Sequence, residues 1–166
     1  MMAEMAEMAM VSSSFVFVTG STGLLGNNVV QLALERGLHV KALVRSMKKG
    51  QQQFGSPLPQ HLELIEGDLE DSKQFEASMR GCTTVIHCAA YFRDSLKGGK
   101  HWLALHKANV EGTRNLLQCS YAAGVKKFIN ISTIGVFFGA ENQVLDEKCF
   151  RDMRCLFFHL VFLRYF

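Results

Sequence analysis

The stretch "TGSTGLLG" (residues 19–26) directly follows the apolar run "FVFV" (residues 15–18) and places glycines at positions 20, 23 and 26. The apolar run predicts a buried strand, and the pattern of residues 24–36 predicts a helix that Gly37 ends. A glycine-rich segment between a strand and a helix is typical of a phosphate-binding loop. The alternative is a tight turn that binds nothing.

Each glycine has a separate role in such a loop. Gly20 would turn the chain sharply off the strand, Gly23 would let the backbone approach a pyrophosphate, and Gly26 would let the helix pack closely on the sheet. The start of the helix would then offer N–H groups and the positive end of its dipole to the phosphates.

Strand and helix patterns alternate through the following residues. Further strands are predicted at residues 39–44, 62–68, 83–90 and 126–133, and helices at 71–79 and 102–123; the polar segment 46–60 is predicted to be a loop. The strands lack polar–apolar alternation, as expected when both faces of a sheet are covered. The sequence therefore predicts an α/β fold: a doubly wound parallel sheet, or Rossmann fold, incomplete on its C-terminal side.

The composition excludes several classes of protein. The chain has 166 residues, a net charge of +3 with scattered basic residues, five cysteines without a C-x-x-C pair, and six histidines without metal-ligand spacing. These numbers favour one domain with reduced thiols, and argue against nucleic-acid binding and a metal site. No secretory signal and no apolar run of about 18 residues is present, so we expect a cytoplasmic protein without a membrane partner.

The residue at the end of the second predicted strand indicates the cofactor. An acidic residue about 20 residues beyond the glycines would bind the ribose 2′-hydroxyl of NAD, but this sequence has Arg45 there, followed by Lys48 and Lys49. A guanidinium group suits a 2′-phosphate by charge and by forked hydrogen bonding. The sequence therefore favours NADP over NAD, with a solvated basic loop as the alternative.

Five motifs occur together in one order: "TGSTGLLG" at 19–26, "GDLED" at 67–71, "VIHCAA" at 85–90, "NVEGTRNLL" at 109–117 and "FINISTIGVFFG" at 128–139. In these the chain resembles the extended short-chain dehydrogenase/reductase family, and within it the dihydroflavonol-reductase and sugar-epimerase/dehydratase branches. The matching residues cover most of the range 15–139.

The resemblance implies a set of cofactor-binding residues. Asp68 would accept a bond from the adenine amino group, and Ala89 and Ala90 would line the nucleotide pocket. Asn109 would bond to backbone near the strand ends, the alternative being an exposed polar residue on a helix, and Gly112 would pack closely on the sheet. The complete cofactor-binding set is Gly20, Thr22, Gly23, Leu24, Leu25, Gly26, Arg45, Asp68, Leu69, Ala89, Ala90 and Asn109.

For catalysis, the resemblance implies hydride transfer at the nicotinamide, with proton transfer by a tyrosine followed four residues later by a lysine. The substrate-binding hydroxyl falls on Thr133, with Ser132 beside it. No tyrosine of this chain is followed four residues later by lysine. We therefore expect a truncated or frame-shifted enzyme: a disordered leader at 1–14, an NAD(P)-binding domain at 15–145, and an atypical apolar tail at 146–166.

Three functions follow from these observations. The first is an NADP(H)-dependent oxidoreductase that reduces carbonyls or oxidises alcohols of a small metabolite, with a sugar-nucleotide epimerase or dehydratase as its variant. The second, favoured for the chain as it stands, is a nucleotide-binding module without turnover. The third is an unstable product without a function. An exposed sheet edge also predicts marginal stability and self-association.

Overall fold

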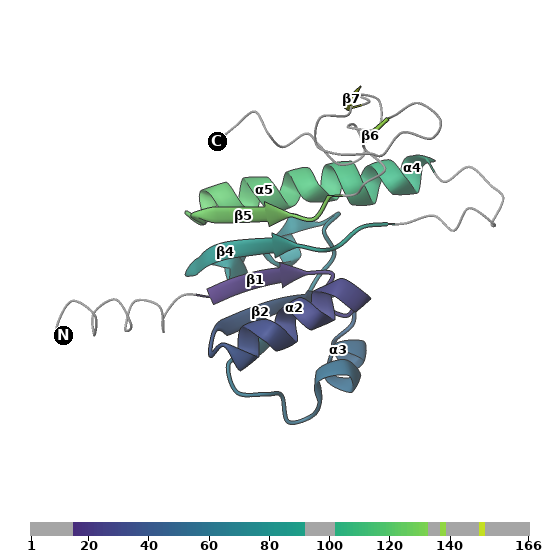
Figure 1. The fold of residues 1–166 in the computed structure, drawn as a ribbon. Helices are drawn as coiled ribbons and strands as arrows, with labels where there is room; N and C mark the ends of the chain where they lie inside the picture. Colours follow the sequence, from purple (N-terminus) through teal and green to yellow (C-terminus); the bar gives the residue numbers. More distant parts are fainter. Residues whose placement is uncertain (1–14, 92–101, 133–136, 139–149, 152–166) are drawn as a thin grey trace.

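The computed structural model describes residues 15–91, 102–132, 137–138 and 150–151. Its centre is a five-stranded sheet in the order β3-β2-β1-β4-β5, with every neighbouring pair parallel (Figure 1). The strands are β1 (Phe15–Thr19), β2 (His39–Val44), β3 (Leu62–Glu66), β4 (Cys82–His87) and β5 (Lys127–Asn130). The predicted doubly wound parallel sheet is confirmed.

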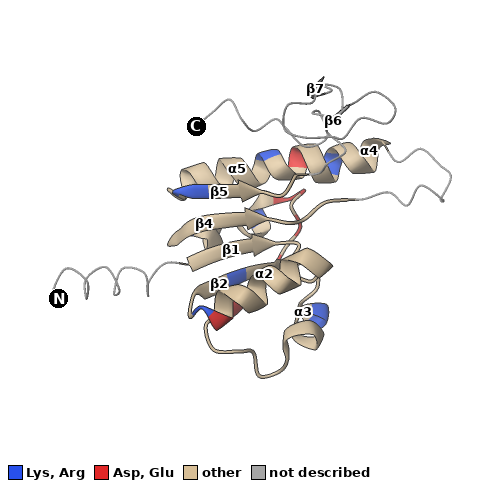
Figure 2. Ribbon diagram, viewed as in Figure 1, with Lys and Arg blue, Asp and Glu red and all other residues tan. Residues whose placement is uncertain are grey.

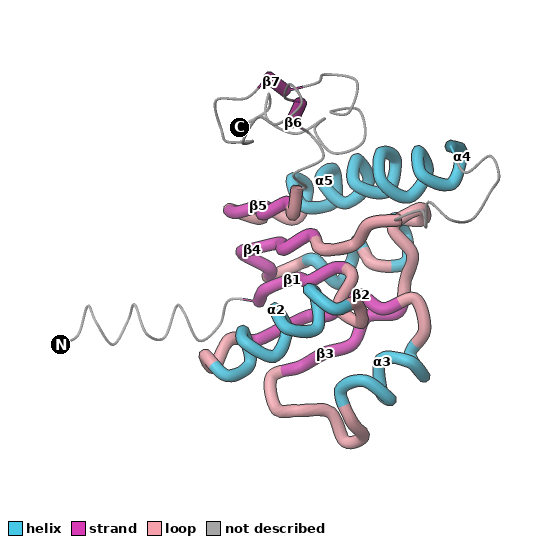
Figure 3. The backbone as a smooth tube through the Cα atoms, turned by 45° about the vertical axis from the view of Figure 1, so that its right-hand side comes forward, coloured by secondary structure: helices cyan, strands magenta, loops and turns pink. Residues whose placement is uncertain are grey.

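Helical segments connect these strands. The segments are α2 (Leu24–Glu35), α3 (Met47–Phe54), the 3₁₀ turns η1 (Ser72–Gln74) and η2 (Glu76–Met79), and the continuous run α4 (Trp102–Leu105), η3 (His106–Glu111) and α5 (Gly112–Ala122). Two short strands, β6 (Phe137–Phe138) and β7 (Phe150–Arg151), form an antiparallel pair. Figure 3 shows the parallel strands side by side, with α2 in front of β1 and β2 and α5 beside β5.

The sheet buries apolar side chains on both faces, and alternation along β1 shows this directly. Val16 and Val18 pack with Val30 of α2 in one core, whereas Phe17 packs with Phe75 and Leu116 in a second core on the other face. Phe17, Val18, Val30, Phe75 and Leu116 are completely buried. Burial of both faces explains why the strand sequences are almost continuously apolar.

The prediction of a loop at 46–60 was wrong in part, because α3 occupies the first half of this segment. Its sequence, MKKGQQQF, has little apolar character, and the helix forms because its ends are fixed. The Ser46 side chain accepts a hydrogen bond from the Lys49 N–H at 3.4 Å, a helix-capping contact. At the other end Phe54 is buried in the first core. The predicted helix at 71–79 is instead the two 3₁₀ turns.

The predicted helix at 102–123 is present and contains a π-helical segment, η3. The Thr113 hydroxyl donates a hydrogen bond to the Asn109 carbonyl at 2.7 Å. A side-chain donor at this carbonyl competes with the regular main-chain bond of an α-helix, a recognised cause of local irregularity. Asn109 therefore lies where the helix departs from regular α geometry.

Charged residues do not form a single-sign surface over the described chain. Figure 2 shows basic residues on β5, α5, β2 and α3, with acidic residues between them. Among the described residues, no helix combines the length and apolar character needed to cross a membrane.

Candidate functional site

A cleft of about 490 Å³ opens at the carboxyl ends of the parallel strands. The chain passes from β1 to β2 and β3 on one side and later to β4 on the other, so the cleft lies where the strand order reverses. This is the general ligand position in open α/β sheets. The residues lining it are Gly20, Thr22, Gly23, Leu43, Arg45, Gly67, Asp68, Leu69, Cys88, Ala89, Ala90, Tyr91 and Ala108.

The glycine loop (residues 19–26) forms one side of the cleft by close backbone packing. Gly20 has φ = 65°, and a Cβ on it would lie 2.7 Å from the Ala89 nitrogen. A Cβ on Gly26 would lie 2.1 Å from the Gly20 carbonyl oxygen. Side chains at these two positions cannot be accommodated without moving backbone, so the loop fits the cradle that the sequence predicts.

The last three residues of this loop, 24–26, are also the first residues of α2. Gly23 is the N-cap residue and supplies no side-chain hydrogen bond to the first turn. The side chains of Leu24 and Leu25 are 89% and 47% exposed, and neither leucine lines the cleft. What residues 24–26 offer an anion is therefore the N–H groups of a helix N-terminus.

Arg45 follows β2 directly, is exposed, and lines the cleft. Within the described part of the chain, no carboxylate lies within ion-pair distance of its guanidinium group. A neighbouring carboxylate, Glu66 at the end of β3, instead accepts a hydrogen bond from the Met47 N–H at 3.0 Å. This contact holds the start of α3 against β3 and leaves Arg45 available to an anionic ligand.

The segment after β3 brings Asp68 and Leu69 to the cleft; their place beside the adenine stays a prediction. The Asp68 carboxylate accepts a hydrogen bond from the Glu70 N–H at 3.0 Å, and the Asp68 N–H donates to the Gln74 side chain at 2.9 Å. These local bonds hold Asp68 in a tight turn while leaving it partly exposed.

Ala89 and Ala90 line the opposite side, and Asn109 holds the backbone that follows them. The Asn109 side chain accepts a hydrogen bond from the Tyr91 N–H at 2.6 Å and donates one to the Tyr91 carbonyl at 2.9 Å. Asn109 does not line the cleft itself. Its paired bonds hold the Tyr91 backbone beyond β4, and a role for Asn109 in cofactor binding stays a prediction.

A buried polar network, which the sequence reasoning missed, links the ends of β1 and β4 to the helix. Thr113 donates its hydroxyl proton to the Asn109 carbonyl, so His87 Nε2, at 3.0 Å, donates to the Thr113 oxygen. His87 Nδ1 then accepts from the Thr19 hydroxyl at 2.6 Å. The Thr19 oxygen also accepts from the Ala89 N–H at 3.3 Å. The available signal was a histidine at the end of a predicted buried strand, directly after Val85 and Ile86.

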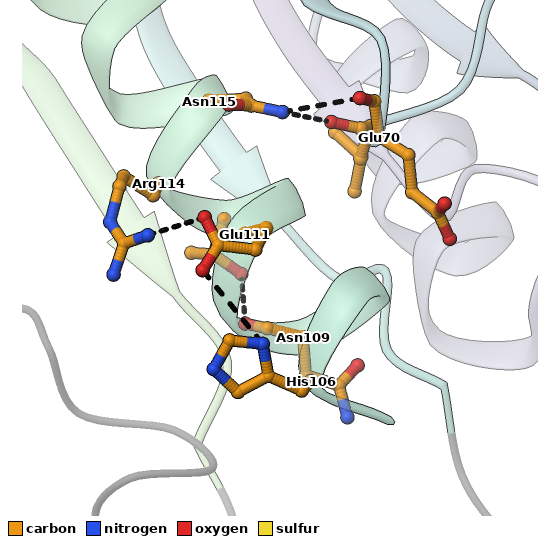
Figure 4. Close-up of polar contacts among 8 residues, drawn as sticks. Glu70, His106, Asn109, Glu111, Arg114 and Asn115 are labelled. Carbon is orange, nitrogen blue, oxygen red and sulfur yellow. Dashed lines mark hydrogen bonds and ion pairs between the residues drawn. The ribbon is translucent and has the colours of Figure 1, made fainter. Parts of the chain in front are cut away.

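Two more residues missed by sequence reasoning support the cleft. The buried Ser21 hydroxyl donates to the Leu43 carbonyl at 2.7 Å and ties the glycine loop to β2. The Asn115 side chain donates to the Leu69 carbonyl at 2.9 Å (Figure 4). Neither could be assigned a partner from sequence, because each bond joins segments far apart in the chain.

The predicted substrate-side hydroxyls are placed only in part. Ser132 is exposed two residues beyond β5, and Thr133 lies outside the described residues, as do the leader 1–14, most of the loop 91–100 and most of the tail 146–166. Catalytic roles for Ser132 and Thr133 stay predictions. In the described ranges, no group of three or more His, Cys, Asp or Glu side chains could hold a metal ion.

Cys88 lies in the cleft between the two sides, and burial raises the pKa of its thiol above the ordinary value of 9.0. The thiol is therefore protonated at neutral pH, whereas catalytic cysteines react as thiolates.

Comparison with known proteins places these motifs in a wider context. The model of the NAD dependent epimerase/dehydratase family matches residues 16–153. A dihydroflavonol 4-reductase of Gerbera hybrida is 32% identical over 149 residues, covering 86% of this chain and 40% of the relative. A 3-beta-hydroxysteroid dehydrogenase of Mycolicibacterium neoaurum is 32% identical over 140 residues, covering 80% of this chain and 36% of the relative.

The fold is also found among solved structures. A UDP-glucose 4-epimerase of Thermus thermophilus, solved in complex with NAD, superposes with a TM-score of 0.69 at 27% identity. The superposition covers 83% of this chain and 44% of the epimerase. The chain thus spans 36 to 44% of the length of these relatives.

Proposed function

The chain belongs to the NAD dependent epimerase/dehydratase family, and from this premise we propose that its cleft binds NADP(H) in preference to NAD(H). The observation that carries the proposal is Arg45: an exposed cation that lines the cleft at the end of β2, without a carboxylate partner in the described residues. A 2′-phosphate would supply the missing anion, and no acidic side chain stands at this position to bind a ribose hydroxyl.

The remaining cleft residues suit the other parts of the dinucleotide. The pyrophosphate would lie at the glycine loop and the start of α2, where added Cβ atoms would collide with backbone. The adenine would lie beside Asp68 and Leu69, and the chain between them along Ala89 and Ala90. When bound, the nicotinamide supplies hydride transfer; the residues described here bind and orient the nucleotide.

The reaction class rests on the relatives. A reductase and a hydroxysteroid dehydrogenase, each 32% identical to this chain, support carbonyl reduction or alcohol oxidation of a small metabolite. The likeness to a UDP-glucose 4-epimerase holding NAD favours a second candidate, an epimerase or dehydratase acting on a sugar nucleotide. Since these relatives are more than twice as long as the matched region, we propose that this chain binds the nucleotide cofactor. Whether it also turns over a substrate is a question for the assay below.

Calorimetric titration of the 166-residue chain with NADPH and NADH tests the proposal. We expect tighter binding of NADPH, and we expect Arg45→Asp to weaken NADPH binding about 10- to 100-fold, the range of a lost charge-assisted hydrogen bond. NADH binding should be retained and tighten in the same variant, because an aspartate at this position can accept a hydrogen bond from the ribose 2′-hydroxyl of NADH.

Arg36→Gln is the matched control, because Arg36 is an exposed arginine at the end of α2, outside the cleft. It should leave both affinities unchanged. Equal loss of NADPH and NADH binding in Arg45→Asp would contradict the NADP preference, and tighter NADH binding by the wild-type chain would support the epimerase alternative. Oxidation of NADPH with a panel of carbonyl compounds then separates turnover from binding.

A further inference from the structure

Asn115 on α5 connects the helix to the chain segment that follows β3. Its side-chain amide donates a hydrogen bond to the Leu69 carbonyl at 2.9 Å, with the Glu70 carbonyl at 3.5 Å. Figure 4 shows the Asn115 side chain directed at these two carbonyls, away from the cluster of His106, Glu111 and Arg114 on the same helical run. The contact joins residues 46 positions apart in the sequence.

We infer that Asn115 is a positioning residue for the adenine end of the cleft, holding residues 67–71 in place through the Leu69 carbonyl. The inference rests on the proposed function, since it assigns the adenine to this segment. Asp68 and Leu69 line the cleft, whereas Asn115 does not, so its influence on a ligand passes through the backbone it holds.

The backbone of the 67–71 segment has left the sheet and depends on side chains for its shape. Gly67 still donates to the Val44 carbonyl at 2.9 Å, the last sheet-like contact. Beyond it, Asp68 and Gln74 supply bonds within the same stretch of chain. The Asn115 side chain bonds this stretch to a different element, α5, through the Leu69 carbonyl.

Packing brings α5 close enough for this bond. A Cβ on Gly112 would lie 3.0 Å from the Leu69 Cβ, so a larger residue there would force the helix and the segment apart. Asn115 lies about one helical turn beyond Gly112, on the part of the helix that this close approach carries against Leu69. Gly112 allows α5 to approach Leu69 closely, and Asn115 then bonds to the Leu69 carbonyl.

A second contact joins the 67–71 segment to the same helical run, at η3, and provides a comparison. Lys107 and Glu70 form an ion pair at 3.4 Å, with side chains 69% and 41% exposed. Exposed pairs of this kind contribute little to stability. A half-buried amide that satisfies a main-chain carbonyl is the stronger constraint, so the ion pair serves as the control for contact between the segment and the helical run.

Asn115→Asp is the sharpest substitution, because it keeps the side-chain shape and replaces the amide donor by a carboxylate that repels the Leu69 carbonyl. Glu70→Gln is the matched control, removing the ion pair and keeping the shape. The measurements are the dissociation constant of adenosine 2′,5′-bisphosphate and amide hydrogen exchange over 67–71 in the ligand-free chain, at pH 7.5 and a temperature where each variant is folded.

We expect Asn115→Asp to weaken binding of adenosine 2′,5′-bisphosphate about tenfold and to accelerate exchange within 67–71 more than in the β1–β4 core. Glu70→Gln should change the affinity less than twofold. A general loss of stability would instead raise exchange throughout the sheet. If Asn115→Asp does not fold, Asn115→Ser, which is small and neutral, replaces it with the same expected direction.

Unchanged affinity and unchanged exchange in the folded Asn115 variant would overturn the inference. If the wild-type chain binds neither NADPH, NADH nor adenosine 2′,5′-bisphosphate, the proposed function fails. Binding by the wild-type chain together with an unaffected Asn115 variant overturns the positioning role alone.

Discussion

The two sides of the cleft are built by opposite means. The glycine loop takes its shape from missing side chains: Gly20 and Gly26 approach backbone so closely that an added Cβ would lie 2.7 Å and 2.1 Å from neighbouring main-chain atoms. The segments after β3 and β4 take their shape from side chains that are present. Asn109 holds Tyr91, and Asn115 holds Leu69, through bonds of 2.6 to 2.9 Å.

This difference has a chemical basis. A loop that receives a pyrophosphate must offer main-chain N–H groups at close range, and side chains would block them. Under the proposed function, the segments after β3 and β4 would lie beside adenine and ribose and present particular side chains at fixed positions, so their backbones need external support. We therefore expect the glycine loop to be intolerant of any added atom, and the side-chain-held segments to respond in graded fashion to the loss of each bond.

The largest expected effect is that of Gly20→Ala. The substitution combines a left-handed φ of 65° with contact to the Ala89 backbone, so we expect a loss of about 3 kcal/mol or more in unfolding free energy, from the conformational and overpacking costs together. NADPH binding should be lost with it. Urea unfolding and calorimetric titration measure the two effects.

Gly37→Ala is the control for this prediction. Gly37 also has a positive φ, 72°, but nothing lies within 4 Å of an added Cβ. Gly37→Ala should lower the unfolding free energy by only about 1–2 kcal/mol and should preserve NADPH binding. Equal losses of unfolding free energy in Gly20→Ala and Gly37→Ala would contradict this prediction. They would show that the backbone conformation alone, and not the close approach to the backbone after β4, makes glycine necessary at position 20.

An intermediate effect is expected for His87→Leu. His87 is 3% exposed and bonds to both Thr19 and Thr113, so leucine would leave buried hydroxyl groups without these partners, at about 2 kcal/mol. Thermal or urea unfolding measures the loss. His106→Leu, at a half-exposed ring, should change stability by less than about 0.5 kcal/mol. A His87 variant as stable as wild type would show that the network does not hold the β4 side.

The smallest expected effect is the pH dependence of the reactivity of Cys88, which lies where the two sides of the cleft meet. This effect does not involve the stability of the fold. Because burial raises the pKa of this thiol above 9.0, it is protonated at pH 7, and the reactive thiolate increases about tenfold per pH unit up to pH 9. Iodoacetamide labelling of Cys88, followed by peptide mass spectrometry, should rise accordingly and slow when NADPH is bound. A rate that levels off below pH 8 would indicate a lowered pKa and a hydrated junction.

Much of the architecture could be predicted from local sequence. Strand–helix alternation predicted the parallel sheet, and the comparison with solved structures supports it. The main local error, α3, shows the limit of local patterns. Its sequence is mostly polar, and the helix is held by Ser46 at one end, by Phe54 in the core at the other, and by the Glu66 carboxylate 19 residues away.

The sequence by itself determined the glycine loop and the place of Arg45, because both follow from the residues next to them: a strand, a turn that requires glycine, and a helix start. Only the tertiary structure decided which side chains hold the rest of the cleft. Thr19 meets His87 across 68 residues and Asn115 meets Leu69 across 46. Such partners are chosen when parallel strands and a covering helix pack together, and no local pattern carries that choice.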